Sequence, residues 1–450
     1  MPRGDAAAGG DDAAARRAKN WRAVNALMLA STLRMFAVAV RMESEGEIWL
    51  RAYAGDFAAQ VQAQSLLESV AGALGFLLNP LCGGISDSVG RKPVMMLSPI
   101  FMCITAITLA WSPTVSMLCL RRFLMPLSSN PWHTGENACL ADMFAGDSSA
   151  YALAKSRIST LQSATSIGVP IVGGWLASRN IRWPWAVAAL VHLLQTLLAV
   201  VMLEETLPPE GRRPFDWRRS STPLSFLKLF TKGPKLRLVA IKSIWASLGG
   251  QYATYRYAEV HRQQLLDWDI QARGRYKSFS GIFSVCGSWA SGRIISWLGT
   301  RRSLYLGYCT AAFEQLCTGL ARTSSHFYAV RTLQVTSDVS MVAMQYTTTA
   351  VGAAEGFAQG ELQGAISNLG TIVRIFTPLL WGRIYAWGTS VGRPSLIYYC
   401  SALGGIVQIG LVNAILRAPT PGEETGEEMV LTPRAEEEQV TPRSLQQKQE

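Results

Sequence analysis

Charged and apolar positions are strongly segregated along this chain. Residues 93–120 contain no Asp, Glu, Lys or Arg, and the same holds for 69–86, 158–178, 183–203 and 394–416. A helix needs about 20 mostly apolar residues to cross the hydrocarbon of a bilayer. Core helices of soluble proteins carry a polar face every few residues, which these stretches lack. The pattern therefore predicts a helical membrane protein rather than a soluble α-helical one.

The same pattern predicts twelve membrane-spanning helices. Lipid offers no hydrogen-bond partners to open backbone groups, and the alternating ten-residue strands of a membrane barrel are absent from the sequence. The predicted spans are 24–42, 59–82, 93–111, 115–141, 158–178, 183–203, 237–256, 276–296, 303–321, 325–351, 364–388 and 394–416. An even number of spans places both termini on one side, and the Lys and Arg residues of the loops assign that side to the cytoplasm. The basic loop 256–277 runs against this assignment.

A polar, basic and proline-bearing stretch divides the spans into two sets of six. The predicted fold is an all-α membrane protein with two pseudo-symmetric six-helix bundles. We expect a cytoplasmic tail at 1–22, bundles at 23–203 and 237–417, a cytoplasmic linker at 204–236 and a disordered tail at 418–450. The basic linker is also a candidate contact for anionic lipid.

The amino-acid composition excludes several other classes of protein. Hydrophobic residues make up 49% of the chain and charged residues 16%, which excludes a disordered, collagen-like or disulfide-scaffold protein. The net charge of +11 comes from cations in separate loops, so it does not indicate nucleic-acid binding. Because no P-loop or hydrolase motif occurs and the four histidines are scattered, we expect no enzyme activity, cofactor or metal.

The turn after the second predicted span has a similar sequence to a turn about half the chain length further on. The first turn reads GGISDSVGRKP and the second GRIISWLGTRR, with two glycines seven residues apart in each. Duplication of a six-helix unit explains this repeated motif. In transporters built from two such units, the units rock about a site near the membrane midplane. An ordinary positive-inside turn explains the cations alone. The predicted gating loop comprises Gly83, Asp87, Gly90, Arg91, Lys92, Gly292, Arg293, Gly299, Arg301 and Arg302.

With this G-x3-D-x2-G-R-K turn, the chain resembles the major facilitator superfamily. It is most similar to the tetracycline-resistance-like and hippocampus-abundant-transcript-like branch, through VMLEETLP (201–208), GQY (250–252) and QGELQGAISNLGTIVRIFTPLLWG (359–382). The resemblance implies twelve helices and alternating access, with proton- or ion-coupled movement of a small solute by symport or antiport. It also implies a helix-packing motif at Pro170, Gly173 and Gly174, although Pro126 and Val169 stand where the family has glycines.

Ionisable residues inside a span are costly, so they mark cavities or buried partners. Arg34 lies ten residues into the first span, where it either binds an anionic group or neutralises an internal acid. His133 shares a helix face with Glu136 and Asn137, as expected for a polar solute site that carries a proton or for polar contacts between helices. The candidate substrate or proton pathway is Arg34, Asn130, His133, Glu136, Asn137, Gln162, Gln251, Tyr252, Gln345 and Arg374.

Secondary active transport of a small solute is the function that these features favour. The expected partners are the solute, a coupling ion (first of all the proton) and the lipid bilayer, with the chain acting as a monomer and no nucleic acid involved. The alternative is a transport-inactive membrane receptor or scaffold that retains the fold. The complete set of Asp87, Gly90 and Arg91 favours the transporter.

Overall fold

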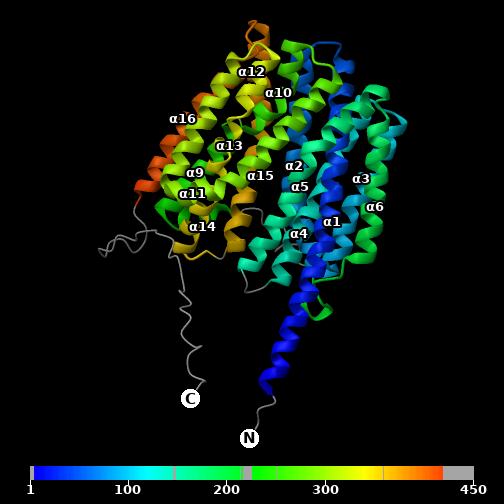
Figure 1. The fold of residues 1–450 in the computed structure, drawn as a ribbon, viewed down its shortest axis with the longest axis vertical. Helices are drawn as coiled ribbons and strands as arrows, with labels where there is room; N and C mark the ends of the chain where they lie inside the picture. The colour runs from blue at the N-terminus through cyan, green and yellow to red at the C-terminus, as the bar shows by residue number, and fades with distance from the viewer. Residues whose placement is uncertain are drawn as a thin grey trace, which may run out of the picture. The chain divides into compact units, whose positions relative to one another are not determined.

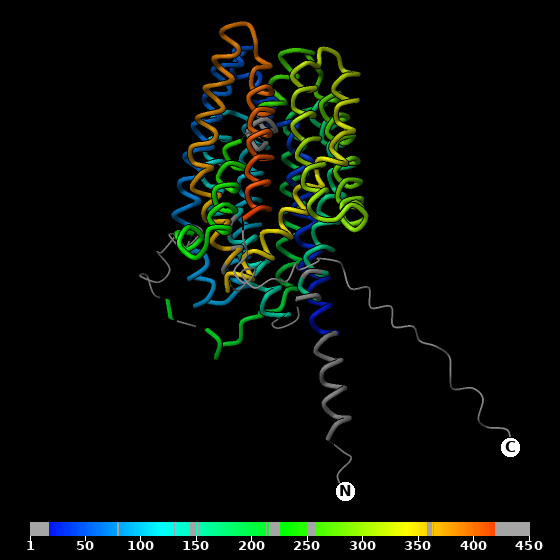
Figure 2. Tube along the Cα trace, turned by 90° about the vertical axis from the view of Figure 1, so that its left-hand side faces the viewer, coloured from blue at the N-terminus to red at the C-terminus, as the bar shows by residue number. Residues whose placement is uncertain are grey.

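The computed structural model describes a helical chain (Figures 1 and 2). Its backbone is described for residues 5–144, 148–212, 214–215, 226–249, 251–357 and 359–418, and no strand occurs in these residues. The expectations for residues 1–4 and for the tail 419–450 lie outside the described residues. So do the side chains of Asn130, Gln251 and Tyr252.

The first six helices run from Asp5 to Met202. They are α1 (Asp5–Tyr53), α2 (Phe57–Val89), α3 (Arg91–Trp111), α4 (Val115–Met143), α5 (Ser148–Arg179) and α6 (Trp183–Met202), and they cover the first six predicted spans to within a residue.

α1 extends well beyond its predicted span at both ends, so Glu43, Glu45 and Glu47 lie on a helix and not in a loop. Arg41 pairs with Glu45 and Arg51 with Glu47 one turn apart. Pairs at this spacing stabilise the extension.

The helices after Met202 are more interrupted. They are η1 (Pro209–Gly211), α8 (Lys228–Thr231), α9 (Pro234–Leu248), α10 (Gln251–Leu266), α11 (Ile270–Leu320), α12 (Ser324–Arg331), α13 (Gln334–Ser337), α14 (Val339–Ala354), α15 (Gln359–Ser390) and α16 (Leu396–Arg417). The seventh predicted span is divided between α9 and α10, and the tenth among α12, α13 and α14. The eighth and ninth both lie in α11, where Gly299 breaks the helical geometry with φ at 76°.

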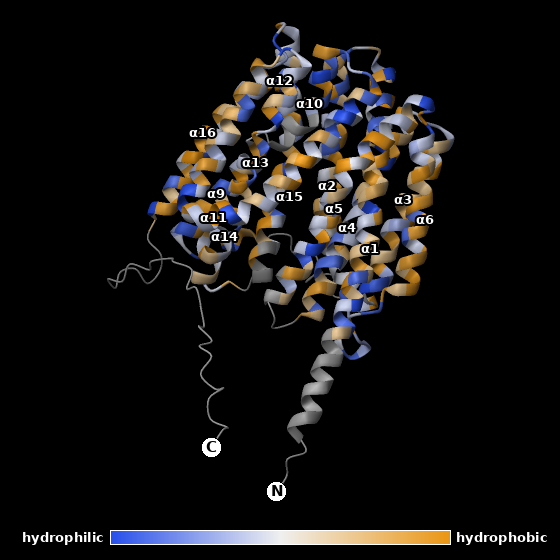
Figure 3. Ribbon diagram, viewed as in Figure 1, coloured by the Kyte–Doolittle hydropathy of each residue, from blue (hydrophilic) through white to orange (hydrophobic). Residues whose placement is uncertain are grey.

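Hydrophobic residues recur along most of the helices (Figure 3), and many of them are exposed. Trp111 of α3 is 84% exposed and Val201 of α6 is 81% exposed, whereas His192 and Gln195 of α6 are buried. Soluble proteins rarely expose such continuous apolar faces, whereas lipid accepts them. Within the described part of the chain, five helices are long and apolar enough to cross a membrane: Ala18–Tyr53, Phe57–Leu78, Arg91–Trp111, Trp183–Met202 and Leu396–Arg417.

The helices pack in two groups, and each group has its own hydrophobic core. In the first group, α1–α6, α1 packs on α5 and α6, and α3 packs on α4 and α6. In the second group, α9–α16, α11 packs on α13, α14 and α16, while α9 packs on α15 and α16. Separate apolar clusters fill the two groups. The groups meet where α2 lies against α15 and where α5 lies against α11 (Figure 2).

The turns between helices define two sides of the assembly, the N side and the far side. The N side is the side on which α1 begins and on which the turn between α2 and α3 lies at Gly90. The far side carries the turns between α1 and α2 and between α5 and α6.

Candidate functional site

A cavity of about 590 Å³ lies where the two helix groups face each other. Helices α1 to α5 line it from the first group, and α10, α11 and α15 line it from the second. Its wall is predominantly basic, because six cationic side chains face three carboxylates. The cations are Arg34, Arg41, Arg121, Arg122, Arg273 and Lys277, and the carboxylates are Glu45, Glu68 and Glu259.

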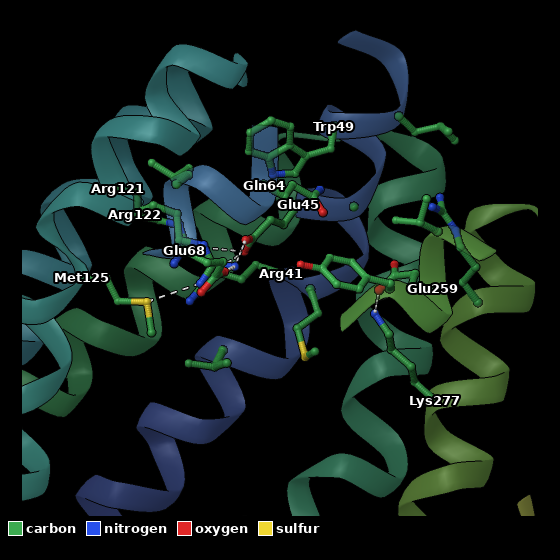
Figure 4. Close-up of a pocket in the computed structure, with 18 of the residues that line it drawn as sticks. Arg41, Glu45, Trp49, Gln64, Glu68, Arg121, Arg122, Met125, Glu259 and Lys277 are labelled. Carbon is green, nitrogen blue, oxygen red and sulfur yellow. Dashed lines mark hydrogen bonds and ion pairs between the residues drawn. The ribbon is translucent and has the colours of Figure 1, made fainter. Parts of the chain in front are cut away.

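On the first-group wall, three arginines surround two glutamates (Figure 4). Glu45 of α1 lies 2.9 Å from Arg41, 2.5 Å from Arg121 and 3.2 Å from Arg122. Arg122 also reaches Glu68 of α2, at 2.8 Å. We call these five residues the first-group ion cluster. It connects α1, α2 and α4 and leaves one positive charge in excess.

A second network crosses between the helix groups on the far side. Glu43 and Glu47 project from α1, Glu259 from α10, and Arg273 and Lys277 from α11. Lys277 lies 2.9 Å from Glu43 and 2.9 Å from Glu259, and Arg273 lies 2.5 Å from Glu47. Glu43 is fully buried and Arg273 is 4% exposed, so these charges depend on one another. We call this network the crossing ion cluster.

Three of the residues selected from sequence line the cavity together: Arg34 of α1, His133 of α4 and Gln162 of α5. His133 is exposed to the cavity, whereas Arg34 is only 4% exposed. No hydrogen bond or ion pair joins Arg34 to another described residue, and its Nε is buried without an acceptor. The Nε2 of Gln162 is also buried without an acceptor.

Glu136 lies behind this wall, where it joins three helices. Its Oε1 lies 2.7 Å from Lys155 Nζ of α5, and its Oε2 accepts a 2.6 Å hydrogen bond from Ser31 of α1. Lys155 also donates to the Oδ1 of Asn137 at 2.8 Å, and Trp132 donates to Ser31 at 2.9 Å. Glu136 is thus paired, and neither it nor Asn137 lines the cavity. Its cationic partner, Lys155, is one that sequence analysis left out.

On the N side, the predicted turn forms an ion network within the first group. Gly90 has φ at 122°, a conformation that glycine adopts without strain. Arg91 pairs with Asp87 of α2 and lies 3.2 Å from Asp142 of α4. The carboxylate of Glu205, just after α6, accepts hydrogen bonds from the backbone N–H groups that begin α3, at 2.9 and 3.1 Å. Four helix ends therefore meet at this turn.

The remaining residues of the first turn have simpler surroundings. Lys92 Nζ donates to the carbonyl of Val200 at 2.8 Å. A Cβ at Gly83 would meet nothing within 4 Å, so no close approach of another helix requires glycine at this position.

The second turn reproduces the backbone of the first but not its ion pairs. Gly299 has φ at 76°, as Gly90 has a positive φ in the first turn. Arg301 and Arg302 are exposed, and Arg293 lies 3.8 Å above the ring of Trp289. Among the described residues, none of these three arginines has an ion pair, because Ser296 replaces the aspartate of the first turn. A Cβ at Gly292 would also face open space.

The Pro170, Gly173 and Gly174 motif lies where α5 crosses α1 and α11. A Cβ on Gly173 would overlap the carbonyl oxygen of Val40 in α1, and one on Gly174 would lie 3.0 Å from the carbonyl oxygen of Ile270 in α11. The reverse holds for Gly274 of α11, whose Cβ would lie 2.6 Å from the carbonyl oxygen of Pro170. Backbones touch directly at this crossing, and only glycine leaves the room.

Two selected residues lie away from the cavity wall. Gln345 is exposed on α14. Arg374 is exposed on α15, where its backbone faces Gly72 of α2. Asn130, Gln251 and Tyr252 have side chains outside the described residues, so their place in the pathway stays a prediction.

Sequence analysis missed the crossing ion cluster, although a signal for it was present. The acids at Glu43 and Glu47 and the cations at Arg273 and Lys277 fall on the same predicted side of the membrane. The cations were noted only as an exception to the positive-inside rule. Their complementary charges explain the exception, since they pair with the acids across the groups.

The sequence profile of the Major Facilitator Superfamily matches residues 27–378 of the chain. Tetracycline resistance protein, class D, from Salmonella ordonez is 23% identical over 346 residues, which cover 76% of this chain and 84% of that protein. Hippocampus abundant transcript-like protein 1 from Homo sapiens is 25% identical over 343 residues, which cover 71% of this chain and 63% of that protein.

Two solved structures show the same fold at low sequence identity. The human organic anion transporter MFSD10 (TETRAN) superposes with a TM-score of 0.65 at 18% identity, over 87% of this chain and 99% of that one. A D-xylose-proton symporter superposes with a TM-score of 0.65 at 14% identity, over 87% of this chain and 97% of that one.

Proposed function

Because this chain belongs to the Major Facilitator Superfamily, we propose that it is a secondary active transporter that moves a small solute across a membrane by alternating access. The cavity between the two helix groups carries this proposal. It is lined by both groups, and the crossing ion cluster holds the groups together on one side of it. Opening that side exposes the same cavity to the opposite compartment.

The proposed membrane topology has twelve spans in two six-helix halves, with both termini in the cytoplasm. The two packing groups with separate cores support the halves. Seven of the predicted spans fall outside the five most apolar helices because they are broken or carry polar residues, as α4 does with Arg121, Arg122 and Glu136. Polar side chains inside a span are expected where helices line a cavity.

The N-side turn supports two-state behaviour. Arg91 connects Asp87 and Asp142 by charge-assisted contacts that neighbouring helix ends make or lose as they tilt. We propose that this network stiffens the N-side end of the first group while the second group rocks against it.

For coupling, we propose the proton and assign it to the Glu136 and His133 region. Glu136 is buried beside the cavity wall with a cationic partner, Lys155, and His133 faces the cavity. Protonating Glu136 would release Lys155, which changes the contacts between α4 and α5. One neighbour of the same fold is named as a proton symporter, which supports this coupling.

Both walls of the cavity come from one chain, which supports a monomer as the working unit. The test is reconstitution of the purified full chain into proteoliposomes, with solute-induced currents recorded on a solid-supported membrane with and without a pH gradient. We expect currents for at least one class of small solute, and larger currents when protons flow with the gradient. A chain that binds solutes but moves none would instead be the transport-inactive receptor.

A further inference from the structure

Among the described residues, Arg34 has no hydrogen-bond or ion-pair partner, although it is a buried cation in the wall of the cavity. Its side chain is 4% exposed, and its Nε has no acceptor among the described residues. Taking a guanidinium out of water without a carboxylate or another acceptor is strongly unfavourable. A residue in this position is stabilised by whatever acceptor enters the cavity.

The nearest carboxylate does not neutralise Arg34. Glu136 attracts Arg34 electrostatically, but it contacts Lys155 at 2.7 Å and accepts a hydrogen bond from Ser31 at 2.6 Å. One negative charge therefore faces two positive ones. His133, the other titratable group on this part of the wall, adds no negative charge in either protonation state.

The excess of positive charge extends over the rest of the cavity. The first-group ion cluster has three arginines for two glutamates, and it lies on the same wall as Arg34. Gln162 adds an Nε2 that is buried without an acceptor. The wall near Arg34 thus offers hydrogen-bond donors that lack acceptors.

The opposite part of the cavity has a different character. On the second-group wall, Glu259 Oε1 and Gln263 Oε1 are buried acceptors without donors. Apolar side chains complete the lining between the two regions: Met35, Val38, Met42, Leu67, Met102 and Val260. A molecule that fits has an acidic group at one end, an apolar body and a hydroxyl or amine at the other.

Resting on the transport function proposed above, we propose that the solute is a small organic anion whose carboxylate, phosphonate or sulfonate group is bound by Arg34 and Gln162. The planar guanidinium binds such a group through two parallel hydrogen bonds. Binding removes the cost of the unpaired cation, so the anion is preferred over a neutral solute of the same size.

Matched pairs of probes test this inference on the purified full chain in lipid nanodiscs. The pairs are benzoate with benzamide, succinate with succinamide, and phenylphosphonate with phenylphosphonamide, and choline serves as the cation. Thermal unfolding is followed at constant ionic strength, since a ligand of the folded state raises the unfolding temperature. We expect stabilisation by at least one anion and none by its amide.

Three variants separate binding from folding. Arg34→Gln should weaken the anion effect at least tenfold, and Arg34→Lys should keep part of it because the charge remains. Arg393→Gln removes an exposed cation at the far-side turn before α16, without touching the cavity, and should match the wild type. Size-exclusion profiles show which variants fold, and if Arg34→Gln does not, Gln162→Ala should still weaken anion binding.

The outcomes distinguish this inference from the transport proposal. If no anion stabilises the chain more than its amide does, or if Arg34→Gln and Arg34→Lys bind anions like the wild type, the inference is wrong. If proteoliposomes then carry a neutral or cationic solute at the same rate with Arg34→Gln, the transport proposal stands without it. If no solute of any class is carried, the transport proposal fails separately, whatever the binding result.

Discussion

Lys277 of α11 lies 2.9 Å from Glu43 of α1, and Glu43 is completely buried. This ion pair joins two helices that belong to different packing groups and lie more than 200 residues apart in sequence. A buried charge is stable only while its partner is present. Two charges that depend on each other therefore join the helix groups on the far side of the assembly.

Lys277→Met should open the far side. Glu43 and Glu259 both lose a cation at 2.9 Å, and leaving buried charges unpaired costs about 3–5 kcal/mol. We expect a lower unfolding temperature and faster labelling, from the far side, of a cysteine placed at Gln60 in the cavity wall. Membrane-impermeant thiol reagents measure this in a cysteine-free background.

Arg51→Gln is the matched control for Lys277→Met. Arg51 also pairs with an α1 glutamate at 2.9 Å, but its side chain is 64% exposed, and exposed pairs contribute about 1 kcal/mol or less. Equal labelling rates in the two variants would mean that the crossing ion cluster does not keep the far side closed.

Glu205→Ala should destabilise the N-side turn, whereas Glu204→Ala should not. Glu205 accepts hydrogen bonds from the backbone N–H groups of Arg91 and Lys92, which begin α3. Losing a helix cap costs about 1 kcal/mol. Within the described part of the chain Glu204 pairs only with Lys19, and both side chains are more than 60% exposed. Thermal unfolding of the two variants tests this difference. Equal falls in the unfolding temperature would show that Glu205 does not cap α3.

Gly173→Ala should disrupt the helix crossing, whereas Gly168→Ala should be tolerated. The new methyl group at Gly173 would overlap the backbone oxygen of Val40, which cannot rotate away, and overpacking of this kind costs about 1–3 kcal/mol. At Gly168, on the same helix, no atom lies within 4 Å of the Cβ position. The yield of folded protein and the unfolding temperature report the difference. A Gly173→Ala protein as stable as Gly168→Ala would show that α1 and α5 do not pack in this way.

Glu136→Gln should remove coupling to the pH gradient while solute exchange at equal pH continues. Glutamine keeps the hydrogen bond to Ser31 but loses the charge that holds Lys155. We expect the gradient-driven current to fall at least tenfold.

Asp87→Asn should slow both transport modes instead, because it weakens the N-side network around Arg91. Counterflow and gradient-driven uptake in the same proteoliposomes separate the two effects. If neither Glu136→Gln nor Asp87→Asn changes transport, the roles assigned to these residues are wrong.

Helix positions were readable from the sequence because lipid forbids charges over long stretches. The charge-free run 183–203 coincides with α6, and the run 93–120 covers nearly all of α3, the turn after it and the beginning of α4. The interruption between α9 and α10 and the break at 332–333 were not predicted, since no proline or charge run marks them. Near the end of α9, Trp245 donates a hydrogen bond to the Gly404 carbonyl of α16, a tertiary contact that the sequence does not reveal.

Single residues of the candidate site were predictable, but their pairing was not. A lone cation near the middle of a span, such as Arg34, stands out by its cost in lipid. Arg121 and Arg122 fall inside the predicted span 115–141 and Glu45 just beyond the predicted span 24–42, but nothing in the sequence shows that these three side chains meet. Their proximity follows from how α1, α2 and α4 pack, which is a property of the tertiary fold.

The glycine crossing of α5 and α11 has a consequence for motion. Main chain meets main chain there, at Gly174 and Gly274, with no interlocked side chains to unpack. A tilt of one helix over the other needs no change of rotamer and creates no void. The resistance to rocking then comes from elsewhere: from the crossing ion cluster, and from α2, where Val61 packs among Tyr257, Trp381 and Tyr385 of the second group.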